Sequence, residues 1–165
     1  MNFTAEPAVP PPSFTVRPGR AGDRDAVWPL ARALATSRVP TREAFNETFD
    51  GLLDAPDRLL LVAETAEPPE TGAPGEPAIV GYALAFAHRA FHSDGPVVWL
   101  EEIVVGPASR ALGAGRSLMA AAEAWARDPI GAAYLALATR RAAPFYRALG
   151  YQGSATYYKR DLAGR

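Results

Sequence analysis

Apolar residues recur three and four positions apart in three stretches of the chain, which is the spacing of one face of an α-helix. The first stretch follows Asp23, the second follows Thr41, and the third runs from about Ser109 to Trp125. Asp and Thr commonly cap helix N-termini, so Asp23 and Thr41 mark two expected helix starts. The predicted inner faces are Val27, Leu30, Ala31 and Leu34; Phe45, Phe49, Leu52 and Leu53; and Leu112, Gly115, Met119, Ala122 and Trp125.

Runs of β-branched and apolar residues indicate strands between and after these helices. The continuous apolar run over residues 58–63 is typical of a buried strand, and the strand predicted at 79–88 is its expected hairpin partner. Further strands are predicted at 14–17, 99–105, 133–138 and 154–159, and a short helix around Phe145 and Tyr146 should end at Gly150. The resulting order is β-α-α-β-β-β-α-β-α-β, with a parallel, right-handed crossover between the strands at 99–105 and 133–138.

The length of 165 residues suits one domain with a core of ordinary size. Four prolines among the first twelve residues predict a disordered tail at 1–12, so the single domain is expected to cover 13–165. The stretch from Glu67 to Pro77 also contains four prolines and predicts an exposed loop. The composition, 48% hydrophobic and 21% charged, is that of a soluble globular protein.

Composition also excludes several classes of site. No run approaches the roughly 18 apolar residues that cross a bilayer, and the N-terminus lacks a signal-type pattern, so we expect a cytoplasmic protein with no membrane partner. The absence of cysteine excludes disulfides, thiol nucleophiles and thiolate metal sites. Two histidines, His88 and His92, are too few for a convincing metal cluster, so no metal is expected.

Charge is balanced overall but unevenly distributed. The net charge of −1 gives no support for nucleic-acid binding. Residues 42–76 contain nine acids against two arginines, whereas residues 110–165 contain nine basic residues against three acids. Solvated faces of unequal sign would explain this asymmetry. It also fits a polyanionic ligand in the C-terminal half and a cationic acceptor near the N-terminal half.

A glycine-containing loop stands where the strand ending at Val105 gives way to the third helix. The loop contains Arg110, Gly113 and Gly115. The two glycines have no Cβ and so leave the first-turn N–H groups of the helix uncovered, which suits a phosphate or pyrophosphate. A dinucleotide-binding loop would need a third glycine three residues later, where Leu118 stands, and a P-loop would need Gly-Lys-Ser/Thr. Neither pattern fits.

The same loop resembles the acyl-CoA signature of the GCN5-related N-acetyltransferase (GNAT) superfamily, Arg/Gln-x-x-Gly-x-Gly/Ala. The family usually has glycine directly after the arginine, where this chain has Ala111. The segment from Ala142 to Tyr151 resembles the family's A-x-x-F-Y-x-x-L-G-F/Y motif. The resemblance covers roughly residues 14–162. It implies an α/β fold in which a mixed, strongly twisted sheet is flanked by helices on both faces, in agreement with the predicted element order.

The resemblance implies acetyl-CoA as co-substrate and direct attack by a primary amine in a ternary complex. The loop would bind the pyrophosphate, while the preceding strand would bond the pantetheine arm as an added strand and supply an oxyanion donor. Where the family often has an asparagine, Thr139 can still hydrogen-bond the cofactor. The expected cofactor-binding residues are Ile103, Val104, Val105, Arg110, Ala111, Leu112, Gly113, Ala114, Gly115, Arg116, Ser117, Thr139 and Tyr146.

Three residues are candidates for proton transfer. Glu101 and Glu102 stand on an otherwise apolar strand, where carboxylates are costly unless they are paired or functional. Alternation predicts opposite faces for them, with Glu101 on the face of Trp99, Ile103 and Val105. A primary amine is mostly protonated at neutral pH and must lose a proton before attack. Glu101 resembles the family position that often relays this proton, and either glutamate could instead be structural.

Tyr146 matches the family's general acid, because a phenol can protonate the departing thiolate at little cost. The acceptor is expected to be an amine of a small molecule or a peptide, and a homodimer remains an option. Two alternatives stay open: a non-catalytic acyl-CoA-binding or regulatory module of the same fold, and a purely structural α/β domain. The residues expected near the acceptor groove are Phe45, Phe49, His88, Phe91, His92, Tyr157 and Tyr158.

Overall fold

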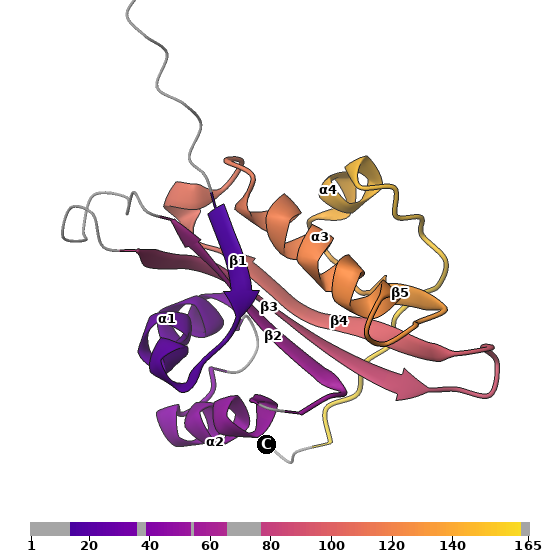
Figure 1. Cartoon of the computed structure of the whole chain (residues 1–165), viewed down its shortest axis with the longest axis horizontal. Helices are drawn as coiled ribbons and strands as arrows, with labels where there is room; N and C mark the ends of the chain where they lie inside the picture. The colour runs from indigo at the N-terminus through magenta and orange to yellow at the C-terminus, as the bar shows by residue number, and fades with distance from the viewer. Residues whose placement is uncertain (1–13, 36–38, 54, 66–76, 163–165) are drawn as a thin grey trace, which may run out of the picture.

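A sheet of five strands runs through the part of the chain that this computed structural model describes, residues 14–35, 39–53, 55–65 and 77–162 (Figure 1). The strands are β1 (Phe14–Pro18), β2 (Arg58–Thr65), β3 (Ala78–Arg89), β4 (Pro96–Val105) and β5 (Tyr134–Leu137). The helices are α1 (Arg24–Leu34), α2 (Arg42–Leu52), α3 (Ala114–Arg127) and α4 (Ala143–Ala148), with 3₁₀ turns η1 (Ala21–Asp23) and η2 (Pro107–Ser109). The predicted tail at 1–12 lies outside the described residues, as does the predicted loop at 67–77 apart from Pro77.

The strands lie side by side in chain order, β1-β2-β3-β4-β5. Successive pairs from β1 to β4 are antiparallel, whereas β5 is parallel to β4. The predicted hairpin of β2 with β3 and the predicted parallel β4–α3–β5 unit are both confirmed. Helices α1 and α2 cover one face of the sheet, and α3 and α4 lie on the other (Figure 1). The predicted α/β architecture with a mixed sheet is therefore correct.

Each face of the sheet buries its own cluster of apolar side chains. Strand β2 shows the division, because Leu59 and Leu61 belong to the cluster under α3 while Leu60 and Val62 belong to the cluster under α1 and α2. This alternation explains why β2 reads as a continuous apolar run. The helix side chains buried against the two faces are Val27 of α1, Phe49 of α2, Tyr146 of α4, and Ala114, Leu118, Met119, Ala122 and Ala126 of α3.

The pleat of β4 is interrupted by a β-bulge at Glu101. On β3, Leu84 pairs with Glu102 and the next residue, Ala85, pairs with Leu100, so Glu101 has no partner in the ladder. An extra residue of this kind shifts the following side chains by one position relative to the faces of the sheet. Such bulges are frequent next to active sites.

The bulge overturns the predicted placement of Glu101 on one face with Trp99, Ile103 and Val105. Ile103 and Val105 pack on the cluster under α3. Both neighbours of Trp99 in β4 belong to that same cluster, so Trp99 points to the opposite face. Glu102 also points to the face of α1 and α2. Strict alternation fails here because it takes no account of the extra residue.

Helix α3 begins at Ala114, five residues later than predicted from Ser109. The intervening loop contains Ala111 with φ of 62° and Gly113 with φ of 108°. Backbone with positive φ cannot continue a right-handed helix, so the first helical turn forms only after Gly113. The consequence is a loop that ends at an uncovered helix N-terminus.

The prediction of a strand at 154–159 is wrong. The structure describes these residues, and they form no strand. Every residue of the segment is exposed, with Tyr157 at 62% and Tyr158 at 88% of full exposure. Tyrosine and threonine favour strands only where a neighbouring surface buries one face of them. Here the ring of Tyr157 stacks on Trp99 at 6.3 Å between centroids, and the backbone of the segment makes no ladder.

Asp23 precedes α1 as predicted, but its side chain does not cap the helix. Instead its carboxylate accepts two hydrogen bonds from the Arg17 guanidinium, at 2.7 and 2.8 Å, and one from the backbone N–H of Arg20 at 2.7 Å. Glu64 accepts a further bond from Arg17 at 2.5 Å. The group ties β1, η1 and β2 together. Thr41, by contrast, caps α2 as predicted, since its hydroxyl accepts from the Ala44 N–H at 3.2 Å.

Candidate active site

The parallel strands β4 and β5 separate at the end of their shared ladder. Pairing stops at Leu100 and Leu137, although β4 continues to Val105. A cleft of about 780 Å³ opens between the diverging segments. Beyond Leu100 the edge of β4 that faces the cleft has no strand partner among the described residues, so its backbone groups can bond an extended ligand. The cleft is lined by residues 100–105, Ser109, Arg110, Ala111, Gly113, Gly115, Arg116, residues 137–142, Phe145, Tyr146, and Ala33 and Leu34 of α1.

One end of the cleft is the N-terminus of α3. The first intrahelical bond runs from the Ser117 N–H to the Gly113 carbonyl at 3.0 Å, and the N-cap residue makes no side-chain bond to the helix. The N–H groups of residues 114–116 therefore have no partner within the helix. Gly113 is needed for its positive φ, whereas a Cβ at Gly115 would make only ordinary contacts of 3.5 Å or more. This terminus has the donors and the positive dipole end that anions prefer.

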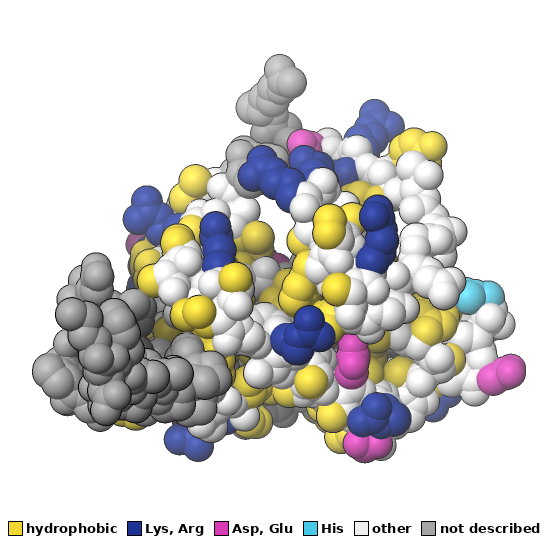
Figure 2. Space-filling model, turned by 90° about the horizontal axis from the view of Figure 1, so that it is seen from above, with side chains coloured by type: hydrophobic (Ala, Val, Ile, Leu, Met, Phe, Trp, Pro, Cys, Tyr) yellow, Lys and Arg dark blue, Asp and Glu magenta, His cyan; other side chains and the backbone are white. Residues whose placement is uncertain are grey.

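Four arginines of the described chain line the same cleft: Arg110, Arg116, Arg140 and Arg141. The Arg110 Nε donates to the Val105 carbonyl at 3.1 Å, which fixes this side chain across the start of the loop. Figure 2, which views the molecule from the side of α4 and the start of α3, shows Lys and Arg side chains around a hollow. With the free helix N-terminus, these side chains suit a ligand that carries several phosphate charges.

Tyr146 of α4 lines the cleft and is only 7% exposed. Its ring packs edge-on against Phe145 and Tyr151, with centroids 5.1 and 5.9 Å away. Burial raises the pKa of the Tyr146 phenol, so the hydroxyl stays protonated at neutral pH. Tyr151 differs because its hydroxyl is committed to Glu123, to which it donates at 2.8 Å. Tyr146 therefore brings a protonated phenol to the lining of the cleft.

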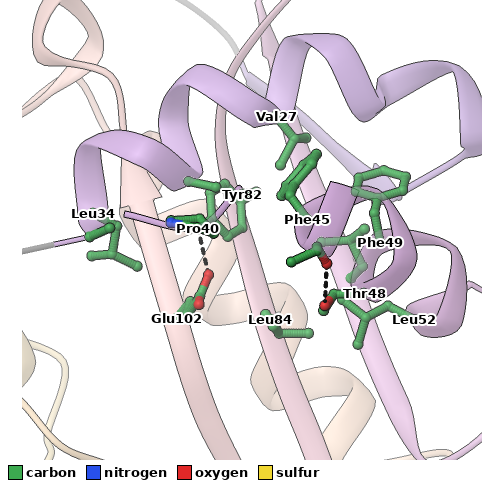
Figure 3. Close-up of a pocket in the computed structure, with 14 residues that line it drawn as sticks. Val27, Leu34, Pro40, Phe45, Thr48, Phe49, Leu52, Tyr82, Leu84 and Glu102 are labelled. Carbon is green, nitrogen blue, oxygen red and sulfur yellow. Dashed lines mark hydrogen bonds between the residues drawn. The ribbon is translucent and has the colours of Figure 1, made fainter. Parts of the chain in front are cut away.

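A second cavity, of about 390 Å³, lies between the sheet and helices α1 and α2, and we call it the apolar pocket. Figure 3 shows Val27, Phe45, Phe49 and Leu52 around this space, with Glu102 at one side of it. Of the described residues, Leu34 and Glu102 line both the apolar pocket and the cleft. The complete lining is Val27, Ala31, Leu34, Ala35, Pro40, Ala44, Phe45, Thr48, Phe49, Leu52, Leu60, Tyr82, Leu84 and Glu102.

Glu102 is the carboxylate at this junction. The Tyr82 hydroxyl donates to it at 2.6 Å, from the neighbouring strand β3. Burial raises the pKa of Glu102, the hydrogen bond from Tyr82 lowers it, and the nearby charge of Glu101 raises it further, with a net upward shift. Burial also raises the pKa of Tyr82, so this phenol remains the donor. Glu101, by contrast, is exposed and lines only the cleft.

Most of the predicted cofactor-binding residues meet in the cleft, including Ile103, Val104 and Val105. Thr139 also lines it, but its hydroxyl oxygen already accepts a bond from the Ala142 N–H at 3.0 Å. Three predicted residues do not line the cleft: Leu112, Ala114 and Ser117. Of these, Ala114 is fully buried in the core and Leu112 is 47% exposed.

The predicted acceptor residues are not gathered in one groove. Phe45 and Phe49 line the apolar pocket, but His88 is exposed near the far end of β3. His92 lies in the β3–β4 turn, where its Nε2 is 2.8 Å from the Tyr134 hydroxyl. This turn joins the end of β4 opposite to Val105, so the histidines are distant in the fold from the α3 terminus. Phe91 is likewise fully exposed, as Tyr157 and Tyr158 largely are.

The lining residues that the sequence patterns did not indicate include Tyr82, Arg140 and Arg141. The two arginines directly follow the predicted strand at 133–138, so their position at a strand end was an available signal. Tyr82 sits inside an apolar run, where a buried phenol usually requires a partner. Its partner Glu102 could not be found without the register of β3 against β4.

Two further features bear on the kinds of site present. Among the described residues, no three His, Asp or Glu side chains are grouped as they would be around a metal ion. Within that same part of the chain, no helix is long and apolar enough to span a membrane.

Comparison with known proteins gives a consistent family. The model of the acetyltransferase (GNAT) family matches residues 26–151. Glucosamine-6-phosphate N-acetyltransferase from Arabidopsis thaliana shares 18% identity and a TM-score of 0.74, over 92% of this chain and 99% of that chain. The aminoglycoside N-acetyltransferase AAC(6')-Iy in complex with CoA shares 21% identity and a TM-score of 0.73, over 94% and 99%.

A transcriptional regulator from Bacillus halodurans shares 19% identity and a TM-score of 0.71, over 91% of this chain and 100% of that chain. Because these identities are below 25%, the structural similarity shows a shared fold and nothing about substrates. None of the curated proteins compared with the chain matches it. The family model covers most of the chain, including the cleft from β4 to α4. The chain therefore belongs to the GNAT family of acetyltransferases.

Proposed function

We propose that this protein transfers an acetyl group from acetyl-CoA to a primary amine by direct attack in a ternary complex. The observation that best supports the proposal is the position of Glu102, whose carboxylate lines both the cleft and the apolar pocket. A donor in the cleft and an acceptor in the pocket would meet at this carboxylate. Membership of an acetyltransferase family supports acetyl transfer in general.

The cleft fits the acyl donor in shape and charge. The free N–H groups at residues 114–116 and the arginines Arg110, Arg116, Arg140 and Arg141 suit its phosphates. The unpaired edge of β4 beyond Leu100 suits the amides of its pantetheine arm. When bound there, acetyl-CoA would supply the thioester carbonyl that the amine attacks.

Glu102 is the favoured acceptor of the first proton. A primary amine has a pKa near 10.4 and is protonated at neutral pH, so the nucleophile forms only when a base removes one proton. A carboxyl with a raised pKa is a better base than an ordinary one near neutrality. Glu101 remains the competing candidate, since it too lines the cleft. Glu101 is exposed, however, and it does not line the apolar pocket.

Tyr146 is the favoured donor of a proton to the leaving thiolate. As the amine nitrogen bonds to the carbonyl carbon, the C–S bond breaks and the sulfur takes the phenol proton. The phenolate regains a proton from the nitrogen, which must lose one to become an amide. The net change releases one proton, the one removed by the base. A non-catalytic acyl-CoA-binding module remains the alternative, but such a module needs neither Glu102 nor Tyr146 in these positions.

Donor binding is tested by thermal melts with acetyl-CoA. Ligand at about 100 times its dissociation constant should stabilise the fold by roughly 2.7 kcal/mol. Gly113→Val should abolish this stabilisation, because a branched side chain is strained at φ of 108° and obstructs the helix terminus. Gly153→Val is the matched control, since Gly153 is exposed with open space around it. A melt unmoved by millimolar acetyl-CoA would contradict donor binding.

Catalysis is tested by thiol release from acetyl-CoA across a panel of amines. Tyr146→Phe should lower kcat by roughly 10²- to 10³-fold with little change in melting temperature or acetyl-CoA binding. Tyr151→Phe removes a neighbouring hydroxyl that is bonded to Glu123, and should leave kcat close to that of the wild type. Binding of acetyl-CoA without turnover of any amine would favour the non-catalytic alternative. Full activity of Tyr146→Phe would reassign this residue to packing.

A further inference from the structure

The described side chains that line the apolar pocket carry very few polar atoms. Of the fourteen described residues that line it, only Thr48, Tyr82 and Glu102 carry them. The Thr48 hydroxyl donates to the Ala44 carbonyl at 2.8 Å, and the Tyr82 hydroxyl donates to Glu102 at 2.6 Å. Both hydroxyl protons are therefore committed within the protein. The oxygens of these two hydroxyl groups can still accept a hydrogen bond, but the carboxylate of Glu102 is the one charged acceptor among the described lining side chains.

The scarcity of polar atoms among these lining side chains limits the kinds of ligand that the pocket can hold. A hydroxyl or ammonium group buried without a partner loses its hydration and gains no bond in return. A sugar or polyamine would bring several such groups into the pocket, where a single carboxylate could satisfy only one ammonium. A ligand with one amine and an apolar body would instead place its body against side chains such as Phe45, Phe49 and Leu84.

The charged side chains of helices α1 and α2 also favour a ligand with an apolar body over a ligand that carries phosphate. Arg24 is paired with Asp50, and Arg42 is paired with Asp25, so these guanidinium groups are already neutralised. Their planes also lie over aromatic rings, Arg24 over Phe49 and Arg42 over Phe45. Within the described chain, no arginine or lysine lines the apolar pocket. A phosphate-bearing acceptor would therefore find no cation among these lining residues.

We propose that the acceptor is a monoamine with an apolar alkyl or arylalkyl body, which fills the apolar pocket while its nitrogen lies at Glu102. This inference rests on the proposed N-acetyltransferase function and specifies its substrate class. The volume of about 390 Å³ is near the lower end of small-molecule sites, which span roughly 300–1,000 Å³. A single compact body fits that volume.

The test measures kcat/KM for acetyl transfer to linear alkylamines from propylamine to octylamine, and to 2-phenylethylamine, glucosamine 6-phosphate and sisomicin. Each methylene buried in the pocket should raise kcat/KM by roughly fourfold until the pocket is filled. The polar amines should be at least about a hundredfold poorer than the best alkylamine, because several polar groups would be buried unpaired. Equal kcat/KM along the alkyl series, or faster turnover of sisomicin, would overturn the assignment.

A matched pair of variants locates the effect in the pocket. Ala44 lies on α2 and lines the pocket, so Ala44→Leu should fill part of it and lower kcat/KM for octylamine by roughly tenfold or more. Propylamine turnover should fall far less than octylamine turnover, because the shorter amine fills less of the pocket, and the acetyl-CoA melting shift should be retained. Ala26→Leu makes the same change at an exposed position of α1 outside the lining and should have no effect on either amine. An octylamine rate insensitive to Ala44→Leu would place the acceptor elsewhere.

A binding measurement separates failure of this inference from failure of the proposed function. Octylamine should raise the melting temperature of the protein with CoA present, and Ala44→Leu should remove this rise. If polar amines are acetylated but alkylamines neither bind nor react, the substrate assignment fails and the acetyltransferase function stands. If acetyl-CoA binds and octylamine binds without turnover, the function fails and the pocket assignment stands. If octylamine does not bind, the pocket assignment is wrong whatever the turnover.

Discussion

Two partly buried carboxylates in this protein have opposite surroundings. Asp23 accepts three hydrogen bonds, two from the Arg17 guanidinium and one from the Arg20 backbone, and the bonds from Arg17 hold its pKa below the usual range. Glu102 accepts one bond from the neutral Tyr82 and borders an apolar pocket, and burial raises its pKa. One carboxylate is thus stabilised in its charged form, and the other is destabilised in it.

The difference separates a carboxylate that stabilises the fold from one that we propose acts in catalysis. A carboxylate paired with a guanidinium contributes to folding but has little tendency to take a proton near neutral pH. A carboxylate with a raised pKa weakens the folded state at neutral pH and gains basicity in exchange. Asp23 joins β1 to η1 and lines neither cavity, whereas Glu102 lines both of them. The environment, and not the residue type, distinguishes the structural role of Asp23 from the role proposed for Glu102.

The largest expected effect is on turnover in Glu102→Gln. Loss of the base should lower kcat/KM for an amine by roughly 10²- to 10⁴-fold at neutral pH. Glutamine keeps an acceptor for Tyr82 and removes a buried charge, so the melting temperature should not fall. Glu101→Gln is the matched variant, and a small effect there would separate the two glutamates. An equal or larger loss in Glu101→Gln would make Glu101 the base instead.

The next effect in size concerns stability in Asp23→Asn. The neutral side chain weakens two charge-assisted bonds to Arg17, which should lower the free energy of unfolding by roughly 1–3 kcal/mol. Denaturant unfolding measures this loss. The kcat of the remaining folded protein should match that of the wild type. Reduced kcat with unchanged stability would contradict the structural role and blur the distinction from Glu102.

A smaller effect is the pH dependence of these stability changes. The folded pKa of Asp23 is lowered, so its stabilisation is present above its unfolded pKa, near 3.9, and is lost as pH falls through the folded pKa. The folded pKa of Glu102 is raised, so its contribution is fully present below the unfolded pKa, near 4.3, and is lost as pH rises through the folded pKa. Unfolding of the wild type and of each variant from pH 3 to pH 8 measures both trends.

The two variants should therefore diverge with pH. The destabilisation in Asp23→Asn should be greatest at neutral pH and shrink below pH 4. Glu102→Gln should gain stability relative to the wild type as pH rises above roughly 4.3. If both variants lost stability in parallel across this range, the assigned difference between the two carboxylates would be wrong.

The smallest expected effect is in Tyr82→Phe. The Tyr82 hydroxyl favours the charged form of Glu102, so its removal should raise the pKa of Glu102 further. The acidic limb of the kcat/KM profile should then move to higher pH, which lowers the rate at pH 6 by roughly 2- to 10-fold. At the plateau the rate should be close to that of the wild type. A profile that does not move would show that Glu102 does not control the acidic limb.

The fold and most of the residues that line the cleft could be predicted from the sequence alone. Helical spacing predicts three of the four helices, and apolar runs predict the five strands of the described chain, because burial of one helix face or of both strand faces leaves a direct trace in residue order. The loop from Arg110 to Gly115 was equally visible, since positive φ at Gly113 and an uncovered helix start both restrict the residue types allowed. Tyr146 followed from its place in the second motif.

Tertiary structure decided what residue order leaves open. The bulge at Glu101 reassigned the faces of β4, because an extra residue reverses alternation and only the pairing with β3 reveals it. The segment at 154–159 has strand-forming residues but stays exposed, because among the described residues it pairs with no strand and only the ring of Tyr157 stacks on a neighbour, Trp99. The register of β3 against β4 brings Glu102 to Tyr82, although the two residues are twenty positions apart in the sequence. Where a carboxylate is buried, and beside what, depends on that register, and so does its chemistry.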